Sequence, residues 1–146
     1  MKSRSKIENE FINSFYKMYS EKSSKFKNLK TIDLKGLQLV DNDICKLTLI
    51  INNSKVNEVF LQNNYLTDKG SAYIFNCLQK ENKLKNIYLD NNALNDGSLK
   101  YLKEVFKKSG SKSVNLKVIS MTNNAFDNGK ELLKEIKKLT KILIYI

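Results

Sequence analysis

Asparagine and aspartate gather in short polar runs along this sequence, and the run from Asp90 to Gly97, DNNALNDG, is a clear example. Side-chain oxygens crowded in this way are the ligands that a calcium ion prefers, so a calcium loop is the first chemistry to test. The EF-hand pattern D-x-[DN]-x-[DN]-G needs a glutamate six residues later, and this run has none at that place. Leu94, in the middle of the run, suits a core better than a metal site. We therefore expect no metal at these turns.

Catalytic side chains are scarce in the 146 residues. The sequence has no histidine, which excludes histidine-dependent triads, histidine-ligated metals and histidine acid–base chemistry. Cys45 and Cys77 lie far apart among apolar residues, so we expect two buried thiols, with a disulfide or redox pair as the alternative. No nucleophile stands beside a base and no metal ligands cluster, so we expect a protein that is not an enzyme and binds no cofactor.

The polar runs follow an internal repeat. Four segments of eleven residues share a template in which positions 1, 4, 6 and 11 are apolar, and their starts are 27, 28 and 32 residues apart. The alternation of positions 4 and 6 predicts a short strand with one buried face, and stacked copies of the unit predict a parallel sheet over a continuous core. The segments are LKTIDLKGLQL from Leu29, VNEVFLQNNYL from Val56, LKNIYLDNNAL from Leu84 and LKVISMTNNAF from Leu116.

A sharp turn must follow each strand, and asparagine occupies position 9 there in every segment except the first, which has Leu37. An amide side chain can donate to and accept from turn backbone groups, and each such group that is buried without a partner costs about 1–3 kcal/mol. We expect the position-9 amides to form a structural ladder and the position-8 asparagines to face solvent. Position 9 is Asn64, Asn92 and Asn124, and position 8 is Asn63, Asn91 and Asn123.

Each turn leads into a predicted amphipathic helix. Polar residues at positions 12 and 13, such as Thr67-Asp68 and Asn95-Asp96, are typical of helix N-caps, and aspartate there also favours the positive end of the helix dipole. Apolar stripes then indicate a helix face that packs on the core.

The template resembles the leucine-rich repeat, LxxLxLxxNxL, and its period of about 28 residues is similar to that of the ribonuclease-inhibitor-like class. The resemblance covers Leu29 to Ile146. It implies an α/β leucine-rich repeat solenoid, a short horseshoe of about four repeats with parallel strands on the concave face and helices on the convex face. Leu37 departs from the pattern in the first repeat, and terminal repeats are often atypical. The expected units are residues 29–55, 56–83, 84–115 and 116–138, with a partial fifth strand at 139–146.

The N-terminal end of such an array exposes core and needs cover. Ile7, Phe11, Phe15 and Met18 form an apolar stripe at helical spacing. We therefore expect residues 1–28 to form an N-terminal capping helix.

The C-terminal end carries the segment LTKILIYI, which fits template positions 1, 4 and 6 with Leu139, Ile142 and Ile144. The edge of this fifth strand invites pairing with another chain, so we expect weak homodimerisation through it. The alternatives are that local packing covers this strand edge, or that the chain is a piece of a longer solenoid.

The resemblance implies binding on the concave sheet face, where leucine-rich repeat proteins usually bind their partners. Position 5 places Phe60 and Tyr88 on adjacent strands, about 4.8 Å apart. Two aromatic side chains that face solvent there form a candidate hot spot for a partner protein. We therefore expect a non-catalytic protein–protein interaction module. The expected partner-binding residues are Phe60, Tyr88, Glu58, Gln62, Asn86, Asp90, Lys35, Asp33 and Tyr65.

The net charge of +11 lies at the two ends of the chain. Residues 1–30 carry eight basic and three acidic groups, residues 31–98 carry seven and eight, and residues 99–146 carry eleven and four. Solvated helix faces explain such lysines, and a functional basic surface that meets an acidic protein or nucleic acid is the alternative. The concave charge is mixed and no RNA-recognition signature is present, so nucleic acid is the less favoured partner.

Actin regulators of the tropomodulin type carry a similar short repeat array. The basic charge at the ends gives the alternative function, which is binding of nucleic acid or of an acidic, actin-like filament protein through these ends. A regulatory subunit of an enzyme, similar in role to ribonuclease inhibitor, is a further alternative. No apolar run reaches the roughly 18 residues that span a bilayer and no secretory signal is visible, so we expect a cytoplasmic or nuclear protein without membrane contact.

Overall fold

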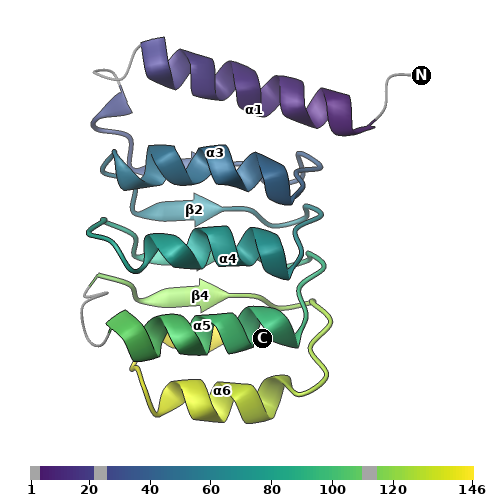
Figure 1. Cartoon of the computed structure of the whole chain (residues 1–146), viewed down its shortest axis with the longest axis vertical. Helices are drawn as coiled ribbons and strands as arrows, with labels where there is room; N and C mark the ends of the chain where they lie inside the picture. Colours follow the sequence, from purple (N-terminus) through teal and green to yellow (C-terminus); the bar gives the residue numbers. More distant parts are fainter. Residues whose placement is uncertain (1–3, 22–25, 110–114) are drawn as a thin grey trace.

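The computed structural model describes residues 4–21, 26–109 and 115–146. These residues form two layers, a parallel β-sheet and a layer of helices, and after the first helix the chain alternates between strand and helix (Figure 1). Figure 1 shows the helices stacked in chain order, with α1 at one end of the stack and α6 at the other. The chain is therefore an α/β solenoid of repeating strand–helix units.

The five strands of the described residues lie in one parallel sheet, in the order β1-β2-β3-β4-β5. The middle residue of every strand is buried and its two neighbours are more exposed, which is the alternation expected of a sheet with one covered face. The face that the helices leave uncovered is called the open sheet face. The strands are β1 Thr31–Asp33, β2 Glu58–Phe60, β3 Asn86–Tyr88, β4 Val118–Ser120 and β5 Leu143–Tyr145.

The helices cover the other face of the sheet, and each helix packs on the next one along the chain, beginning with α1 on α3. Their buried residues recur at helical spacing, as the apolar stripes predict. The described helices are α1 Arg4–Glu21, α3 Asp41–Asn52, α4 Asp68–Cys77, α5 Asp96–Ser109 and α6 Gly129–Lys137.

The core lies between the two layers and runs without interruption from Ile12 in α1 to Ile144 in β5. The strand centres Val59, Ile87 and Ile119 are 0% exposed. Burial of each such aliphatic side chain stabilises the fold by about 1.5–3 kcal/mol before the entropy cost is subtracted. The sheet is therefore a firm platform for the side chains on its open face.

The register of β5 differs from the expected one by two residues. Ile144 lies opposite Ile119 of β4, where the template had placed Ile142. Leu139 was expected at core position 1 but is 43% exposed. It belongs to the turn after α6, where its backbone nitrogen donates to the Ile136 carbonyl at 2.8 Å. A shift by two residues leaves every side chain on the same face, so alternation alone could not choose between the two registers.

The buried face of α1 also differs from the expected stripe. Ile12 is 2% exposed and Phe15 and Tyr19 pack against the core, whereas Met18 is 43% exposed. Phe26 contacts the rings of Phe15 and Tyr19 edge-on, at centroid distances of 6.2 and 5.8 Å. This aromatic cluster fastens α1 to the chain that follows it. The side chains at positions 7 and 11, and the expected cap residues 1–3 and 22–25, lie outside the described residues.

The two cysteines are free, and only Cys77 is buried. Burial raises the pKa of the Cys77 thiol to about 11, so this thiol is protonated and unreactive at neutral pH. Cys45 is exposed, and the expectation of two buried thiols is wrong for it. Its neighbours on α3, Ile44 and Leu47, take the inward face of that helix.

Candidate functional site

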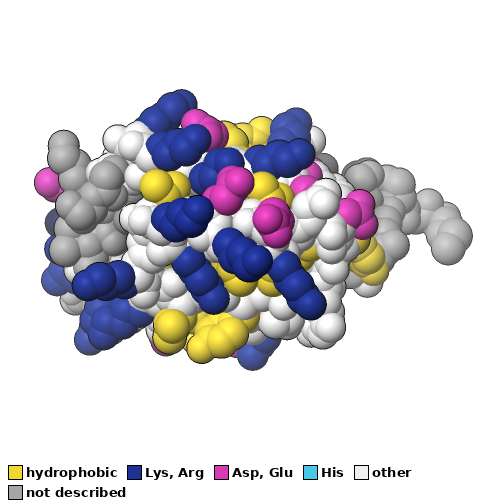
Figure 2. All heavy atoms as spheres, turned by 90° about the horizontal axis from the view of Figure 1, so that it is seen from below, with side chains coloured by type: hydrophobic (Ala, Val, Ile, Leu, Met, Phe, Trp, Pro, Cys, Tyr) yellow, Lys and Arg dark blue, Asp and Glu magenta, His cyan; other side chains and the backbone are white. Residues whose placement is uncertain are grey.

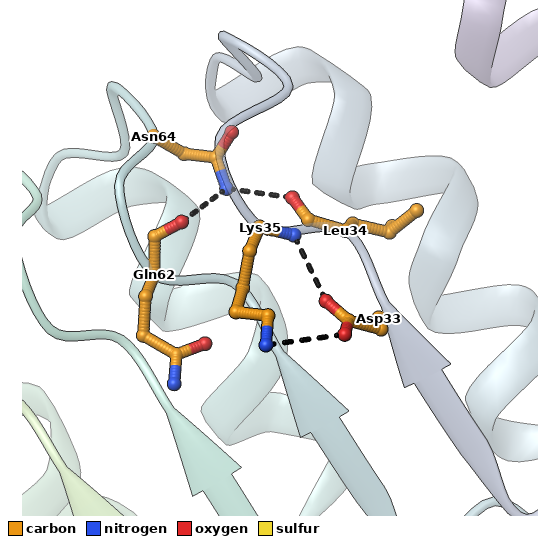
Figure 3. Close-up of polar contacts among 5 residues, drawn as sticks. All are labelled: Asp33, Leu34, Lys35, Gln62 and Asn64. Carbon is orange, nitrogen blue, oxygen red and sulfur yellow. Dashed lines mark hydrogen bonds and ion pairs between the residues drawn. The ribbon is translucent and has the colours of Figure 1, made fainter.

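The turns after the strands are held by the position-9 asparagines, and Figure 3 shows the first of them, Asn64. Its amide nitrogen donates to the carbonyl oxygens of Leu34 and Gln62 at 3.0 and 3.2 Å. Its amide oxygen accepts from the backbone nitrogens of Leu37 and Leu39 at 3.1 and 2.9 Å. One side chain thus satisfies backbone groups of two successive repeats.

The same arrangement recurs one and two repeats further along. The amide oxygen of Asn92 accepts from the backbone nitrogen of Leu66 at 3.0 Å, and that of Asn124 accepts from Leu94 at 3.0 Å. Each amide therefore bonds back to the preceding repeat. Among the described residues the first repeat is preceded by α1 and by no other strand–helix unit, so Leu37 at position 9 removes no such bridge.

A second row of side chains joins the repeats in the forward direction. The position-13 aspartates are the first residues of α3, α4 and α5, and their carboxylates accept hydrogen bonds from the next repeat. Asp41 accepts from the backbone nitrogen and the hydroxyl of Thr67 at 2.8 and 2.5 Å, and Asp68 accepts from the Asn95 backbone nitrogen at 2.8 Å. Position 12 supplies the N-cap, as Thr67 does for α4, whereas position 13 links repeats.

Glycine is required where these carboxylates approach the following helix. A Cβ atom on Gly97 would collide with the Asp68 carboxylate, and one on Gly70 would collide with the Asp41 carboxylate. The glycines after the turns therefore serve close contact between neighbouring repeats.

Position 8 has a structural role that we did not expect from the sequence. Its residues have left-handed backbone, with φ between 54° and 66°. Glycine and asparagine adopt this conformation at lower cost than other residues. The occurrence of one glycine and three asparagines at a single template position was the signal for it. These residues are Gly36, Asn63, Asn91 and Asn123.

The candidate binding surface is the open sheet face, where position 5 forms a row across the strands. Phe60 and Tyr88 are half-buried neighbours in this row, and their rings stack with centroids 4.7 Å apart and planes 7° apart. The ammonium nitrogen of Lys35 lies 5.2 Å from the Phe60 centroid. A cation and two rings thus form one continuous stack. The whole row is Asp33, Phe60, Tyr88, Ser120 and Tyr145.

Lys35 is also paired with Asp33, at 3.2 Å between the ammonium nitrogen and a carboxylate oxygen (Figure 3). Both side chains are about half exposed, at 48% and 51%, so the pair contributes little to stability. The Gln62 amide points toward Lys35 in Figure 3. Its amide oxygen is buried and accepts no hydrogen bond from any described residue. Lys35 thus connects the Phe60 end of the aromatic stack to Asp33.

Glu58 and Asn86 flank the stack, and the Asn86 amide donates to the Glu58 carboxylate at 2.7 Å. Asp90 accepts with its Oδ1 atom from the Ser120 hydroxyl, the Thr122 backbone nitrogen and the Thr122 hydroxyl, at 2.5, 2.9 and 2.6 Å. Burial opposes ionisation of Asp90, but these hydrogen bonds outweigh burial and lower its pKa. Asp90 therefore fastens β3 to the end of β4 in addition to facing the open sheet face.

The structure brings most of the expected site residues together on this face. Tyr65 is the exception, because it lies in the turn between β2 and α4, where it is 46% exposed. Our sequence reasoning missed the apolar C-terminal side of the face, where Leu143 is 56% and Tyr145 is 51% exposed. Val118 of β4 lies opposite Leu143. Leu143 and Tyr145 occupy template positions 3 and 5 of the fifth strand in its observed register, so the template would have identified them had that register been used.

The C-terminal end of the solenoid is one of the two basic ends, and Figure 2 shows lysines and hydrophobic patches intermingled on it. Lys103 is half-buried and pairs with Glu135 at 2.6 Å. The exposed Lys107 pairs with Glu104 at 3.0 Å. No other lysine of this end forms an ion pair with residues that the structure describes. We call the following exposed lysines the basic end: Lys100, Lys107, Lys108, Lys130, Lys134, Lys137, Lys138 and Lys141.

Two further kinds of site can be assessed for residues 4–21, 26–109 and 115–146. Among them, no three histidine, cysteine, aspartate or glutamate side chains gather closely enough to hold a metal ion. No helix in this part of the chain has the length and apolar character needed to cross a membrane.

No protein-family model and no curated protein matches the sequence. Among solved structures, the tropomodulin C-terminal domain of Caenorhabditis elegans is similar, with a TM-score of 0.68 and 14% identity over 92% of this chain and 81% of that chain. The structure of leiomodin-1 actin-binding site 2 is also similar, with a TM-score of 0.69 and 16% identity over 88% of this chain and 78% of that chain. At these identities the likeness shows the fold alone, an α/β repeat solenoid.

Proposed function

We propose that this chain is a non-catalytic protein-binding module whose partner is an actin-like filament protein. One observation carries the choice of partner, namely the similarity over most of both chains to a leiomodin-1 domain that is itself an actin-binding site. We also assign the repeats to the ribonuclease-inhibitor-like class of leucine-rich repeats. The repeat period of about 28 residues and the α-helices of 12, 10 and 14 residues in successive units support this class.

The surface that we assign to the filament is the basic end. Its eight lysines are exposed, and only Lys107 among them has an ion-pair partner in the described chain. Unpaired charges of one sign attract an acidic partner from a distance and accelerate association, an effect that salt weakens. Leu139, which follows Lys138 directly in the chain, is 43% exposed, and Figure 2 shows hydrophobic patches among the lysines of this end. Such apolar surface can be desolvated once contact is made.

The direct test is co-sedimentation of the chain with actin filaments. A variant with Lys134→Glu, Lys137→Glu and Lys138→Glu should bind about tenfold or more weakly, because three attractive charges become repulsive. The affinity of the unmodified chain should also fall as salt rises from about 0.05 to about 0.2 M.

A matched variant controls for net charge. Lys69→Glu, Lys80→Glu and Lys83→Glu change the total charge by the same amount, but these exposed residues lie on or after α4, in the middle of the solenoid. This variant should lose much less affinity. Equal losses in the two triple variants would contradict the basic end, and absence of co-sedimentation at any salt would contradict the actin-like partner.

The open sheet face is a second surface for a partner, and the stacked pair Phe60 and Tyr88 favours it. Large aromatic side chains on a firm platform lose little entropy when a partner covers them. Truncation of either ring to alanine should weaken binding of a partner on this face by more than about 1 kcal/mol. If these variants sediment with actin as the unmodified chain does, the filament uses the basic end alone.

A further inference from the structure

The position-5 row of the open sheet face has a small residue between two tyrosines. Ser120 lies on β4, opposite Tyr88 of β3 on one side and Tyr145 of β5 on the other. Neighbouring strands are about 4.8 Å apart, so the two tyrosines start from strands about 9.6 Å apart. The rings of Phe60 and Tyr88, which lie on neighbouring strands, stack with centroids 4.7 Å apart, so the ring separation matches the distance between the strands. A planar group above Ser120 would therefore continue the stack from Tyr88 toward Tyr145.

We propose that Tyr88, Ser120 and Tyr145 form a binding site for an arginine side chain of a partner protein, with the guanidinium group stacked above Ser120. The site goes beyond the proposed function, because it lies on the sheet and does not depend on the basic end or on an actin-like partner.

The stack already has a cation at its Phe60 end. Lys35 places its ammonium nitrogen 5.2 Å from the Phe60 centroid, and Tyr88 stacks on the same ring. The neighbour of Tyr88 in its own row on the β4 side is Ser120, which has a small side chain. Aromatic faces attract cations through the ring quadrupole, and arginine stacks on them through its planar group.

Asp90 supplies a negative charge at the same place. Its Oδ1 atom accepts hydrogen bonds from Ser120 and Thr122, which leaves Oδ2 without a hydrogen bond from any other residue that the structure describes. The hydrogen bonds at Oδ1 favour the ionised carboxylate. A guanidinium above Ser120 lies next to this carboxylate, and its N–H groups can donate to Oδ2.

The other side of Ser120 is apolar. Val118 and Leu143 lie opposite each other in the position-3 row, and Leu143 is 56% exposed. These side chains suit the aliphatic stem of an arginine, which prefers apolar surface while its charged head stays near polar groups.

Two competing ligands fit this surface less well. A phenylalanine could stack on Tyr88 but would bring no donor to Asp90. A lysine would bring a charge but no planar group, and its ammonium is more strongly hydrated. The net charge of +11 opposes any cation at long range, so selectivity for arginine has to come from contact with Tyr88 and Asp90.

The experiment is an NMR titration of the whole chain with the blocked peptide acetyl-Gly-Arg-Gly-amide. Matched peptides with lysine, phenylalanine or glutamine in place of arginine serve as comparisons. The arginine peptide should give saturable shifts of the Ser120 amide and of the Tyr88 and Tyr145 rings. It should bind about threefold or more tightly than each comparison peptide.

Variants test each part of the site. Ser120→Phe places a ring of the chain itself in the row and should abolish the response. Asp90→Asn keeps an acceptor but removes the charge. Asp90→Asn and Tyr145→Ala, as two separate variants, should each weaken binding about threefold to tenfold. Tyr65→Ala, which removes a tyrosine of similar exposure from a turn, should leave binding unchanged.

Two results would overturn the proposal, an absence of saturable shifts around Ser120 and a stronger response to the phenylalanine peptide than to the arginine peptide. Circular dichroism checks that Ser120→Phe is folded. If it is not, Asp90→Asn and Tyr145→Ala decide the matter, and unchanged binding by both would reject the site. Loss of actin co-sedimentation in the basic-end variant with an intact arginine response would separate the two proposals.

Discussion

The turn edge and the open sheet face are built from the same repeats but use their side chains in different ways. At the turn edge, asparagine recurs at position 9, and its amide bonds to the backbone of two repeats. On the sheet face, position 5 changes from one strand to the next. Recurring residues hold the solenoid together, and varying residues remain available for recognition. The position-5 row is Asp33, Phe60, Tyr88, Ser120 and Tyr145.

Asp90 belongs to both regions. It accepts three hydrogen bonds with one oxygen, which is a structural role, and it lies beside the varying row on the sheet face. Changes at the turn edge should therefore act on stability and changes on the sheet face should act on binding, with Asp90 in between.

The largest effect is expected at the turn edge. Asn92→Ala should lower the free energy of unfolding by about 3 kcal/mol, because several buried backbone groups lose their partner. Asn91→Ala, the neighbouring control, should cost only about 1 kcal/mol for its left-handed backbone. Urea denaturation of both variants measures the difference, and equal costs would contradict the structural ladder.

The contact between repeats gives the next largest effect. Gly97→Ala should cost about 2 kcal/mol, because the added methyl group displaces the Asp68 carboxylate from its hydrogen bonds. The same substitution should cost clearly less in an Asp68→Ala background. A double-mutant cycle measures this coupling, and additive costs would show that the glycine serves another purpose.

The aromatic pair should have a smaller effect on stability. Phe60→Ala and Tyr88→Ala should each leave the chain folded, with a coupling of about 1 kcal/mol between them from the ring stack. A double-mutant cycle in urea gives this value. A coupling near zero would mean that the rings do not stack in solution.

The smallest effect concerns pH. The lowered pKa of Asp90 contributes stability above the unfolded-state pKa of about 4, and this stability is lost as pH falls through the folded-state pKa. The difference in stability between the unmodified chain and Asp90→Asn should therefore shrink at acid pH. Burial raises the pKa of Asp43, so ionisation of Asp43 lowers the stability of the fold as pH rises. Relative to Asp43→Asn, the unmodified chain should therefore gain stability as pH falls, which is the opposite of the trend for Asp90→Asn. Parallel pH profiles for the two variants would contradict these assignments.

The repeat template predicted much of the fold. Spacing of apolar positions placed the strands and the turns, because each repeat must bury the same face against its neighbours. The register of β5 and the buried face of α1 could not be predicted as well. Met18 lies in a segment outside the repeat template, and the segment that begins at Leu139 fits the template in two registers that bury the same face.

The candidate site was predicted in its position but not in its bonding. Template position 5 placed Phe60 beside Tyr88, but no pattern could show that Asp90 already accepts three hydrogen bonds from Ser120 of β4 and from Thr122 just after it. Tyr65 was assigned to the face although it follows the turn. Weak homodimerisation through β5 and the roles of the site residues in binding stay predictions.

Amide hydrogen exchange of the chain with and without saturating actin filaments decides whether the filament covers the basic end. Exchange should slow in α5, in α6 and in the segment that leads to β5, with no change in α3 and α4. Unchanged exchange throughout, or protection confined to α3 and α4, would contradict binding through the basic end.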